Sequence, residues 1–150
     1  MKKLCLILVG SLLSLLVLSG CDKTASTAPT AAVTAMDLAD LPKNSSGFTD
    51  LSVEQLANAM ASKNFTLVNV HVPDQVDLPG TDLSIPFDQI INRLGQLPGK
   101  DAPIVLYCRS GSMSTQAATA LAAAGYSKVY ELDGGFNAWK ATGRGLIGQQ

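Results

Sequence analysis

The chain is poor in the residue types that build metal sites and nucleic-acid interfaces. Its 150 residues include one histidine and three cysteines, and charged residues make up only 15% of the composition. With one histidine and, as shown below, one usable cysteine, a zinc site cannot be assembled from its usual ligands. A net charge of −1 without a basic stripe also gives no indication of nucleic-acid binding. These absences argue against zinc enzymes and nucleic-acid binders.

The sequence also lacks an apolar run that crosses a membrane comfortably. Residues 4–18 form an apolar core of fifteen residues after Lys2 and Lys3, whereas a spanning helix needs about 20. The core ends in LSGC at residues 18–21, which resembles the processing motif of bacterial lipoproteins. We therefore expect residues 1–20 to be a lipoprotein signal peptide and Cys21 to carry lipid that anchors the mature chain to the membrane. An ordinary secretory signal or an uncleaved anchor are the alternatives.

The expected processing also decides how many thiols remain. Cys5 leaves with the signal peptide and Cys21 is consumed by lipidation, so Cys108 is the only free thiol of the mature chain and no internal disulfide forms. Asp22 follows the lipidated cysteine and resembles the signal that retains lipoproteins at the inner membrane of enteric bacteria. If the organism has two membranes, we therefore expect the mature protein at the periplasmic face of the inner membrane. An unpaired thiol on an accessible loop there favours a functional role.

The remaining chain predicts one α/β domain. Residues 21–47 are expected to form the lipidated cysteine and a linker, flexible over residues 22–36, and residues 48–150 the domain. Apolar, β-branched segments predict strands, and capping residues followed by periodic apolar positions predict helices. The expected strands cover residues 65–70, 83–85, 103–107 and 129–132. The first expected helix follows Ser52 as its N-cap, with Gln55 completing a capping box. A second helix is expected from residue 86 to about residue 94, and two more begin at residues 115 and 135. This alternation indicates a mainly parallel sheet with helices on both faces.

Cys108 lies where such a fold places its chemistry. The apolar residues 103–107 lead into this cysteine, and six small or polar residues and an alanine-rich segment follow. The pattern predicts a strand, a tight loop and a helix whose free amide groups and positive dipole end favour a thiolate. Because the thiolate is the nucleophilic form, Cys108 is the first candidate for catalysis. The alternative is a buried cysteine that serves only packing.

Two motifs resemble the rhodanese (thiosulfate sulfurtransferase) family. Residues 107–114 (YCRSGSMS) are similar to its active-site loop, and residues 132–139 (LDGGFNAW) to its closing loop and helix. The resemblance implies a rhodanese-like fold without a cofactor, in which Cys108 carries sulfur as a persulfide from thiosulfate or an organic persulfide to a thiol or cyanide-like acceptor. It also implies that the donor binds against the loop after the cysteine. That loop contains Arg109, Ser110, Gly111, Ser112, Met113 and Ser114.

Several positions depart from the family's usual pattern. Asn69 and His71 stand where the family usually has Asp and Arg in an Asp-Val-Arg motif, and Asp77 stands where a histidine is common. The resemblance therefore places His71 at a structural position, although a lone histidine after a strand also suggests a general base. Met113 replaces a frequent arginine, so we expect weaker binding of thiosulfate. Arg109 either attracts an anionic donor or is a solvated loop charge.

Two other functions remain open at this point. A non-catalytic binding module would keep the fold while the departures at residues 69, 71 and 113 abolish turnover. A cysteine phosphatase would need an arginine six positions after the cysteine, where this chain has Ser114. The phosphatase hypothesis is therefore the weaker of the two.

Overall fold

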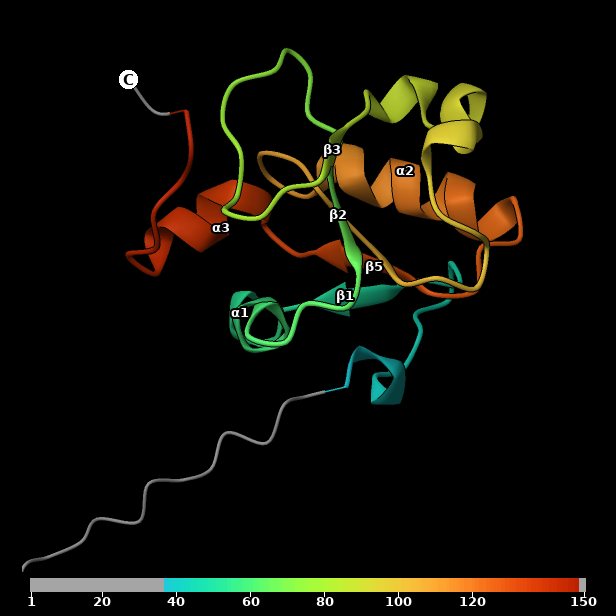
Figure 1. Ribbon diagram of the computed structural model, residues 1–150, viewed down its shortest axis with the longest axis horizontal. Helices are drawn as coiled ribbons and strands as arrows, with labels where there is room; N and C mark the ends of the chain where they lie inside the picture. Colours follow the sequence, from blue (N-terminus) through green and yellow to red (C-terminus); the bar gives the residue numbers. More distant parts are fainter. Residues whose placement is uncertain (1–36, 149–150) are drawn as a thin grey trace, which may run out of the picture. The chain divides into compact units, whose positions relative to one another are not determined.

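The computed structural model describes residues 37–148 of the chain (Figure 1). The expected signal peptide, Cys21 and the tether of residues 22–36 lie outside this range. None of the helices between residues 37 and 148 is both long enough and apolar enough to cross a membrane.

A five-stranded parallel sheet forms the centre of the domain. Its strands are β1 (Thr49–Leu51), β2 (Thr66–Asn69), β3 (Leu83–Ser84), β4 (Ile104–Tyr107) and β5 (Val129–Leu132), in the order β1-β5-β4-β2-β3. Every residue of β4 and β5 is buried, as expected for parallel strands covered on both faces. The predicted α/β class and the four predicted strands are confirmed. The short edge strand β1 was not predicted, because three residues are too few to show a periodic pattern.

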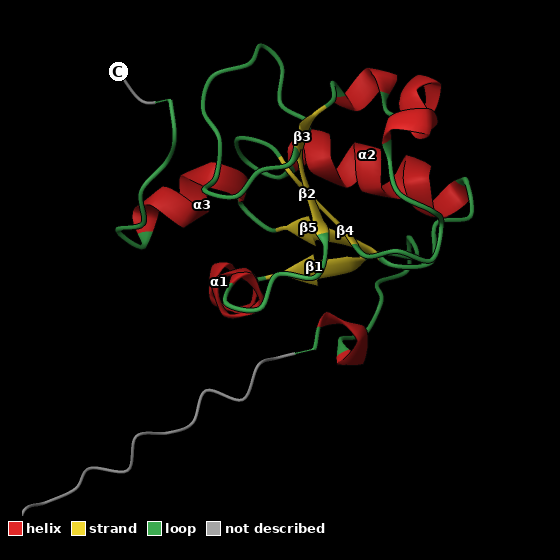
Figure 2. Ribbon diagram, in the orientation of Figure 1, coloured by secondary structure: helices red, strands yellow, loops and turns green. Residues whose placement is uncertain are grey.

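Helices cover the two faces of this sheet (Figure 2). Helices α1 (Val53–Met60) and α3 (Gly135–Ala141) pack on one face; α2 (Ser112–Ala123) and the 3₁₀ helices η2 (Phe87–Gln89) and η3 (Ile91–Gln96) pack on the other. Successive β4 residues alternate between these two apolar layers, since Val105 packs with α1 and Leu106 with α2. The strand that leads to Cys108 is therefore fixed from both sides.

The capping residues predicted for the first helix are confirmed. The Ser52 hydroxyl accepts a hydrogen bond from the Gln55 amide, and the Gln55 side chain accepts one from the Ser52 amide. This capping box satisfies two amide groups that a helix start leaves without partners. Helix α1 thus begins at Val53 and directs Leu56 into the core.

The helix predicted from residue 86 to about residue 94 was wrong. The segment forms η2 and η3 instead, and Arg93 inside η3 has non-helical dihedral angles of φ −119° and ψ 26°. Ile90 is buried, but Ile91 is 43% exposed, so the apolar residues of this segment do not all face the sheet. Only part of the segment between Pro86 and Leu97 packs against the sheet. This contact is too small to stabilise a continuous α-helix.

The domain also begins earlier than the predicted residue 48. Leu38 is buried in the core and starts the short 3₁₀ helix η1 (Leu38–Asp40), which the Asp37 carboxylate caps. Further along, the Asn44 side chain donates a hydrogen bond to the Asp50 carboxylate on β1. Residues 37–47 are therefore part of the fold, because Leu38 and Leu41 cover the apolar face beside β1 and β5.

Candidate active site

Cys108 directly follows the central strand β4 and lies in the core rather than on an accessible loop. Its exposed fraction is only 1%, and it belongs to the apolar layer shared with α2. The expectation of an accessible thiol is thus corrected, because β2 and β5 flank β4 and the Ser114 hydroxyl of α2 contacts the sulfur. The thiol is thus almost fully shielded from solvent.

The residues after the cysteine turn at once into helix α2. Gly111 has φ +94°, which an L side chain rarely adopts, and α2 starts at the next residue. Ser112, Met113 and Ser114 belong to the first turn of the helix instead of the loop. This turn carries the free amide groups and positive dipole end that favour a nearby anion.

The side chains of this segment divide between solvent and core. Arg109, Ser110 and Ser112 are exposed, whereas Ser114 is fully buried. Met113 is half-buried and packs against the apolar layer that contains Cys108. The segment thus combines one exposed cation with an apolar wall.

The second sequence motif holds the first in place. The Phe136 amide donates a hydrogen bond of 2.9 Å to the Cys108 carbonyl oxygen, and the Asn137 amide donates one of 3.0 Å to the Arg109 carbonyl oxygen. A Cβ atom on Gly135 would lie 2.2 Å from the Cys108 carbonyl oxygen. Only glycine at position 135 allows the start of α3 to approach the cysteine this closely.

A buried carboxyl group connects to the thiol through Ser114, and sequence reasoning missed it. The Ser114 hydroxyl lies 3.4 Å from the Cys108 Sγ and 2.5 Å from Oε1 of Glu131 on β5. Burial raises the pKa of Glu131 to about 7; the Ser114 hydrogen bond opposes this rise, and the charges of Asp133 and Asp50 add to it. A single glutamate within the apolar strand of residues 129–132 was the signal available in the sequence.

Two departures from the family pattern meet beside β4. The Asn69 side chain donates hydrogen bonds to the Val76 carbonyl oxygen and to the Asp77 carboxylate, and its own oxygen accepts one from the His71 amide. The Tyr107 hydroxyl donates to the same Asp77 oxygen at 2.9 Å, and burial raises the pKa of Tyr107. An amide at position 69 suits this arrangement, because a second carboxylate would be repelled by Asp77. These bonds fix the loop of residues 73–81 against the strand ends.

The imidazole ring of His71 takes no part in this network. Both ring nitrogens are buried and have no hydrogen-bond partner within residues 37–148, and the ring packs edge-on against Phe136 with 5.5 Å between centroids. In the described part of the chain, the imidazole therefore makes no hydrogen bond to the Cys108 sulfur. The geometry gives His71 a packing position. It does not place the ring as a base for the thiol.

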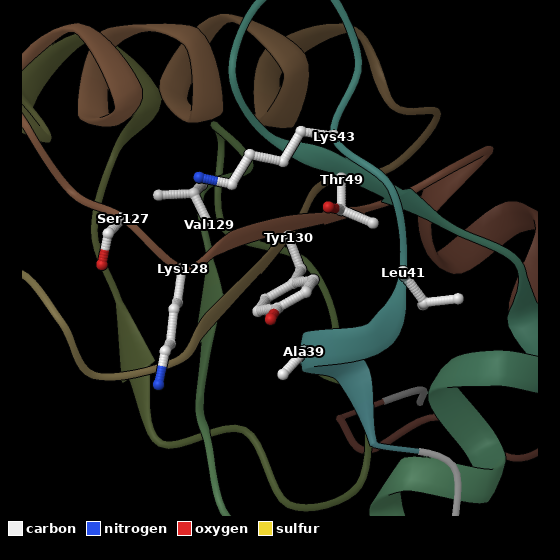
Figure 3. A pocket seen from close by; sticks show the side chains of 8 residues that line it. All are labelled: Ala39, Leu41, Lys43, Thr49, Ser127, Lys128, Val129 and Tyr130. Atoms are coloured by element: carbon white, nitrogen blue, oxygen red, sulfur yellow. The ribbon is translucent and has the colours of Figure 1, made fainter.

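A cavity of about 230 Å³ lies at the amino-terminal ends of strands β1 and β5 (Figure 3). Its lining includes Lys43, Thr49 at the start of β1, and Lys128 and Val129 at the start of β5. Because all strands are parallel, the amino-terminal strand ends lie on the opposite side of the sheet from the carboxyl-terminal end of β4, where Cys108 lies. The cavity is therefore separate from the thiol chemistry. Among the described residues, no group of three or more His, Cys, Asp or Glu side chains is placed to hold a metal ion.

Comparison with known proteins identifies the family. The sequence profile described as "Rhodanese-like domain" matches residues 52–142, which include Cys108 and the Gly134-Gly135 turn. The chain belongs to the rhodanese-like domain family. The match covers most of the described residues and confirms the predicted family and fold.

Individual relatives support this assignment. A protein named sulfurtransferase from Allochromatium vinosum is 32% identical over 102 residues, covering 65% of this chain and 94% of that protein. The thiosulfate sulfurtransferase GlpE of Shewanella oneidensis is 32% identical over 96 residues, covering 63% of this chain and 94% of the enzyme. The solution structure of the rhodanese-like domain of Alr3790 from Anabaena sp. is 25% identical with a TM-score of 0.60, covering 67% of this chain and 79% of that domain.

The close approach at Gly135 predicts a specific loss of stability. Gly135→Ala should lower the free energy of unfolding by about 1–2 kcal/mol for its positive φ, plus about 1–3 kcal/mol for the overlap with the Cys108 carbonyl. Gly143→Ala is the matched control, because Gly143 also has a positive φ but no atom within 4 Å of the added carbon. Urea unfolding of both variants measures the difference. Equal losses would contradict the conclusion that the close approach of residue 135 to the Cys108 carbonyl requires glycine.

Proposed function

We propose that this rhodanese-family protein is a sulfurtransferase in which Cys108 carries the transferred sulfur. The observation that supports the proposal most is the position of Cys108 at the end of β4, against the first turn of α2 and under a loop clamped by α3. This arrangement places amide donors of the helix start near the sulfur, where they would stabilise an anion that forms during the reaction. The relatives named sulfurtransferase and thiosulfate sulfurtransferase support the same reaction class.

The reaction proceeds in two displacements. The Cys108 thiolate attacks the outer sulfur of thiosulfate, a sulfur–sulfur bond forms, and sulfite leaves with the electron pair of the broken bond. An acceptor thiolate or cyanide ion then attacks the outer sulfur of the persulfide and releases the Cys108 thiolate. With an organic persulfide as donor, a thiolate leaves in place of sulfite. The chain's own residues suffice for these steps without a cofactor.

The site does not favour a cysteine phosphatase. The position where such enzymes need an arginine holds Ser114, and the buried carboxyl of Glu131 lies directly behind its hydroxyl. An anionic carboxylate there opposes a phosphate dianion, whereas an arginine would bind it. The structure therefore gives this alternative no support.

Steady-state kinetics test the proposed reaction. With thiosulfate and a thiol or cyanide acceptor, the wild-type chain should show the parallel double-reciprocal lines of a ping-pong mechanism. Cys108→Ser should abolish turnover without loss of folding. Turnover that survives in Cys108→Ser would contradict the proposal, and a folded wild-type chain that turns over neither thiosulfate nor an organic persulfide would favour a non-catalytic binding module.

The half-buried methionine in the first turn of α2 should limit the use of thiosulfate. Met113→Arg adds a cation beside the anionic donor. Because residue 113 is only half-buried, solvent screens this charge, and we expect a gain of roughly 1 kcal/mol, or about fivefold in kcat/KM. The gain should shrink with added salt and be absent for a neutral persulfide. Met113→Gln, which changes shape without charge, should give no gain. Unchanged thiosulfate kinetics in Met113→Arg would show that residue 113 does not face the donor.

We also propose that the protein acts at the bacterial cell envelope, anchored through lipid on Cys21 at the periplasmic face of the inner membrane. The support is the short apolar core that ends in LSGC, followed by Asp22. Cys21→Ala should accumulate as unprocessed precursor without lipid label, because the attachment atom is lost. Cys5→Ala should be processed normally. A cleaved, lipid-labelled product of Cys21→Ala would contradict the anchor.

A further inference from the structure

The Ser114 hydroxyl carries one proton but faces three acceptors. Its oxygen lies 3.4 Å from the Cys108 Sγ, 3.0 Å from the Gly111 carbonyl oxygen and 2.5 Å from Oε1 of Glu131. A hydroxyl donates one hydrogen bond at a time, while it accepts others. Which acceptor receives the proton therefore depends on the charges of the thiol and the carboxyl group.

Two arrangements satisfy the Cys108 thiol, the Ser114 hydroxyl and the Glu131 carboxyl with a single negative charge. In one, the ionised Glu131 carboxylate accepts a hydrogen bond from the Ser114 hydroxyl, and Cys108 remains a protonated thiol. In the other, Ser114 donates to a Cys108 thiolate, and protonated Glu131 donates to the Ser114 oxygen. They interconvert when the thiol proton moves to Ser114 Oγ and the original Ser114 proton moves to Glu131 Oε1, so no proton is gained or lost.

The surroundings of Glu131 disfavour two negative charges at once. The glutamate is 2% exposed on β5, between β1 and β4. The negative charges of the exposed Asp50 on β1 and Asp133 after β5 act on Glu131, and from α2 the Ser114 hydroxyl hydrogen-bonds to it. The salt bridge among residues 37–148 joins Lys63 to Asp82 and leaves Glu131 without a cation. A buried anion pair without a counter-charge is strongly unfavourable.

We propose that Glu131 is a positioning residue of the active site that shares one proton with Cys108 through the Ser114 hydroxyl, so that the thiol and the carboxyl ionise as a coupled pair. The inference rests on the proposed function for its catalytic meaning, since the thiolate of this pair is the form that attacks the sulfur donor. Near neutral pH the pair holds one negative charge, and Glu131 retains inside the site the proton that Cys108 gives up. The pKa of Glu131, raised to about 7, agrees with such sharing.

A coupled pair loses its two protons in separate steps. The thiolate population should rise first to a plateau, where the sulfur and the carboxyl compete for the charge. It should rise again at higher pH, where both groups ionise. In Glu131→Gln the competing charge is absent, so the thiol should titrate in one step with a midpoint below the second step of the wild type.

The test is the ultraviolet absorbance of the Cys108 thiolate in the full chain as a function of pH. The spectrum of Cys108→Ser is subtracted at each pH to remove the signals of the tyrosines, Cys5 and Cys21. We expect two steps at least about one pH unit apart in the wild type and one step in Glu131→Gln. The wild-type curve carries the test even where a variant fails to fold. A single step in the wild type overturns the proposal.

Control variants separate the shared proton from a general charge effect. Asp133→Asn removes a neighbouring carboxylate that has no hydrogen bond to Ser114, and it should keep both steps. In a Ser114→Ala background, Glu131→Gln should change the curve less than it does in the wild type, because the bridging hydroxyl is gone. Equal effects of Glu131→Gln in both backgrounds overturn the role of Ser114.

The titration does not require a sulfur donor, so its failure differs from failure of the proposed function. A chain with two steps but no sulfur transfer supports the coupled pair and contradicts the sulfurtransferase. A chain that transfers sulfur but titrates in a single step supports the sulfurtransferase and contradicts the coupled pair.

Discussion

The structure of the site depends on the close approach of the start of α3 to Cys108. There the Phe136 amide donates a hydrogen bond to the Cys108 carbonyl oxygen, beside Gly135. This contact joins the end of β4 to the start of α3, although 28 positions separate residues 108 and 136 in the sequence. It fixes the backbone of the cysteine while Gly111 turns the chain into α2. The thiol is thereby held against the first turn of a helix.

A buried polar group gives this rigid arrangement its chemical character. The Ser114 hydroxyl links the thiol to Glu131, the charged residue of an otherwise apolar strand. A carboxyl buried without a cation is costly, and natural proteins tolerate such costs mainly at functional sites. The Phe136 hydrogen bond holds the backbone of Cys108, whereas the Ser114 hydroxyl connects its sulfur to the Glu131 carboxyl.

Much of this architecture could be predicted from local patterns, but the contacts between distant segments could not. The capping residues at Ser52 and the apolar run before Cys108 indicate their elements directly, because each depends on neighbours along the chain. The segment after Pro86 misled the prediction, since its apolar period does not reveal that Ile91 faces solvent. The pairing of Asn69 with Asp77 and of Ser114 with Glu131 arises only when strands and helices pack. Sequence motifs indicated where the candidate site lies, and packing showed which groups surround it.

The central claim is that Cys108 receives the sulfur atom, and intact mass spectrometry of the full chain after exposure to thiosulfate or an organic persulfide tests it most directly. The account predicts that the wild-type chain gains the mass of one sulfur atom, that a thiol or cyanide removes it, and that Cys108→Ser gains none. If the wild-type chain gains no sulfur from either donor, or Cys108→Ser gains as much as the wild type, the account is contradicted.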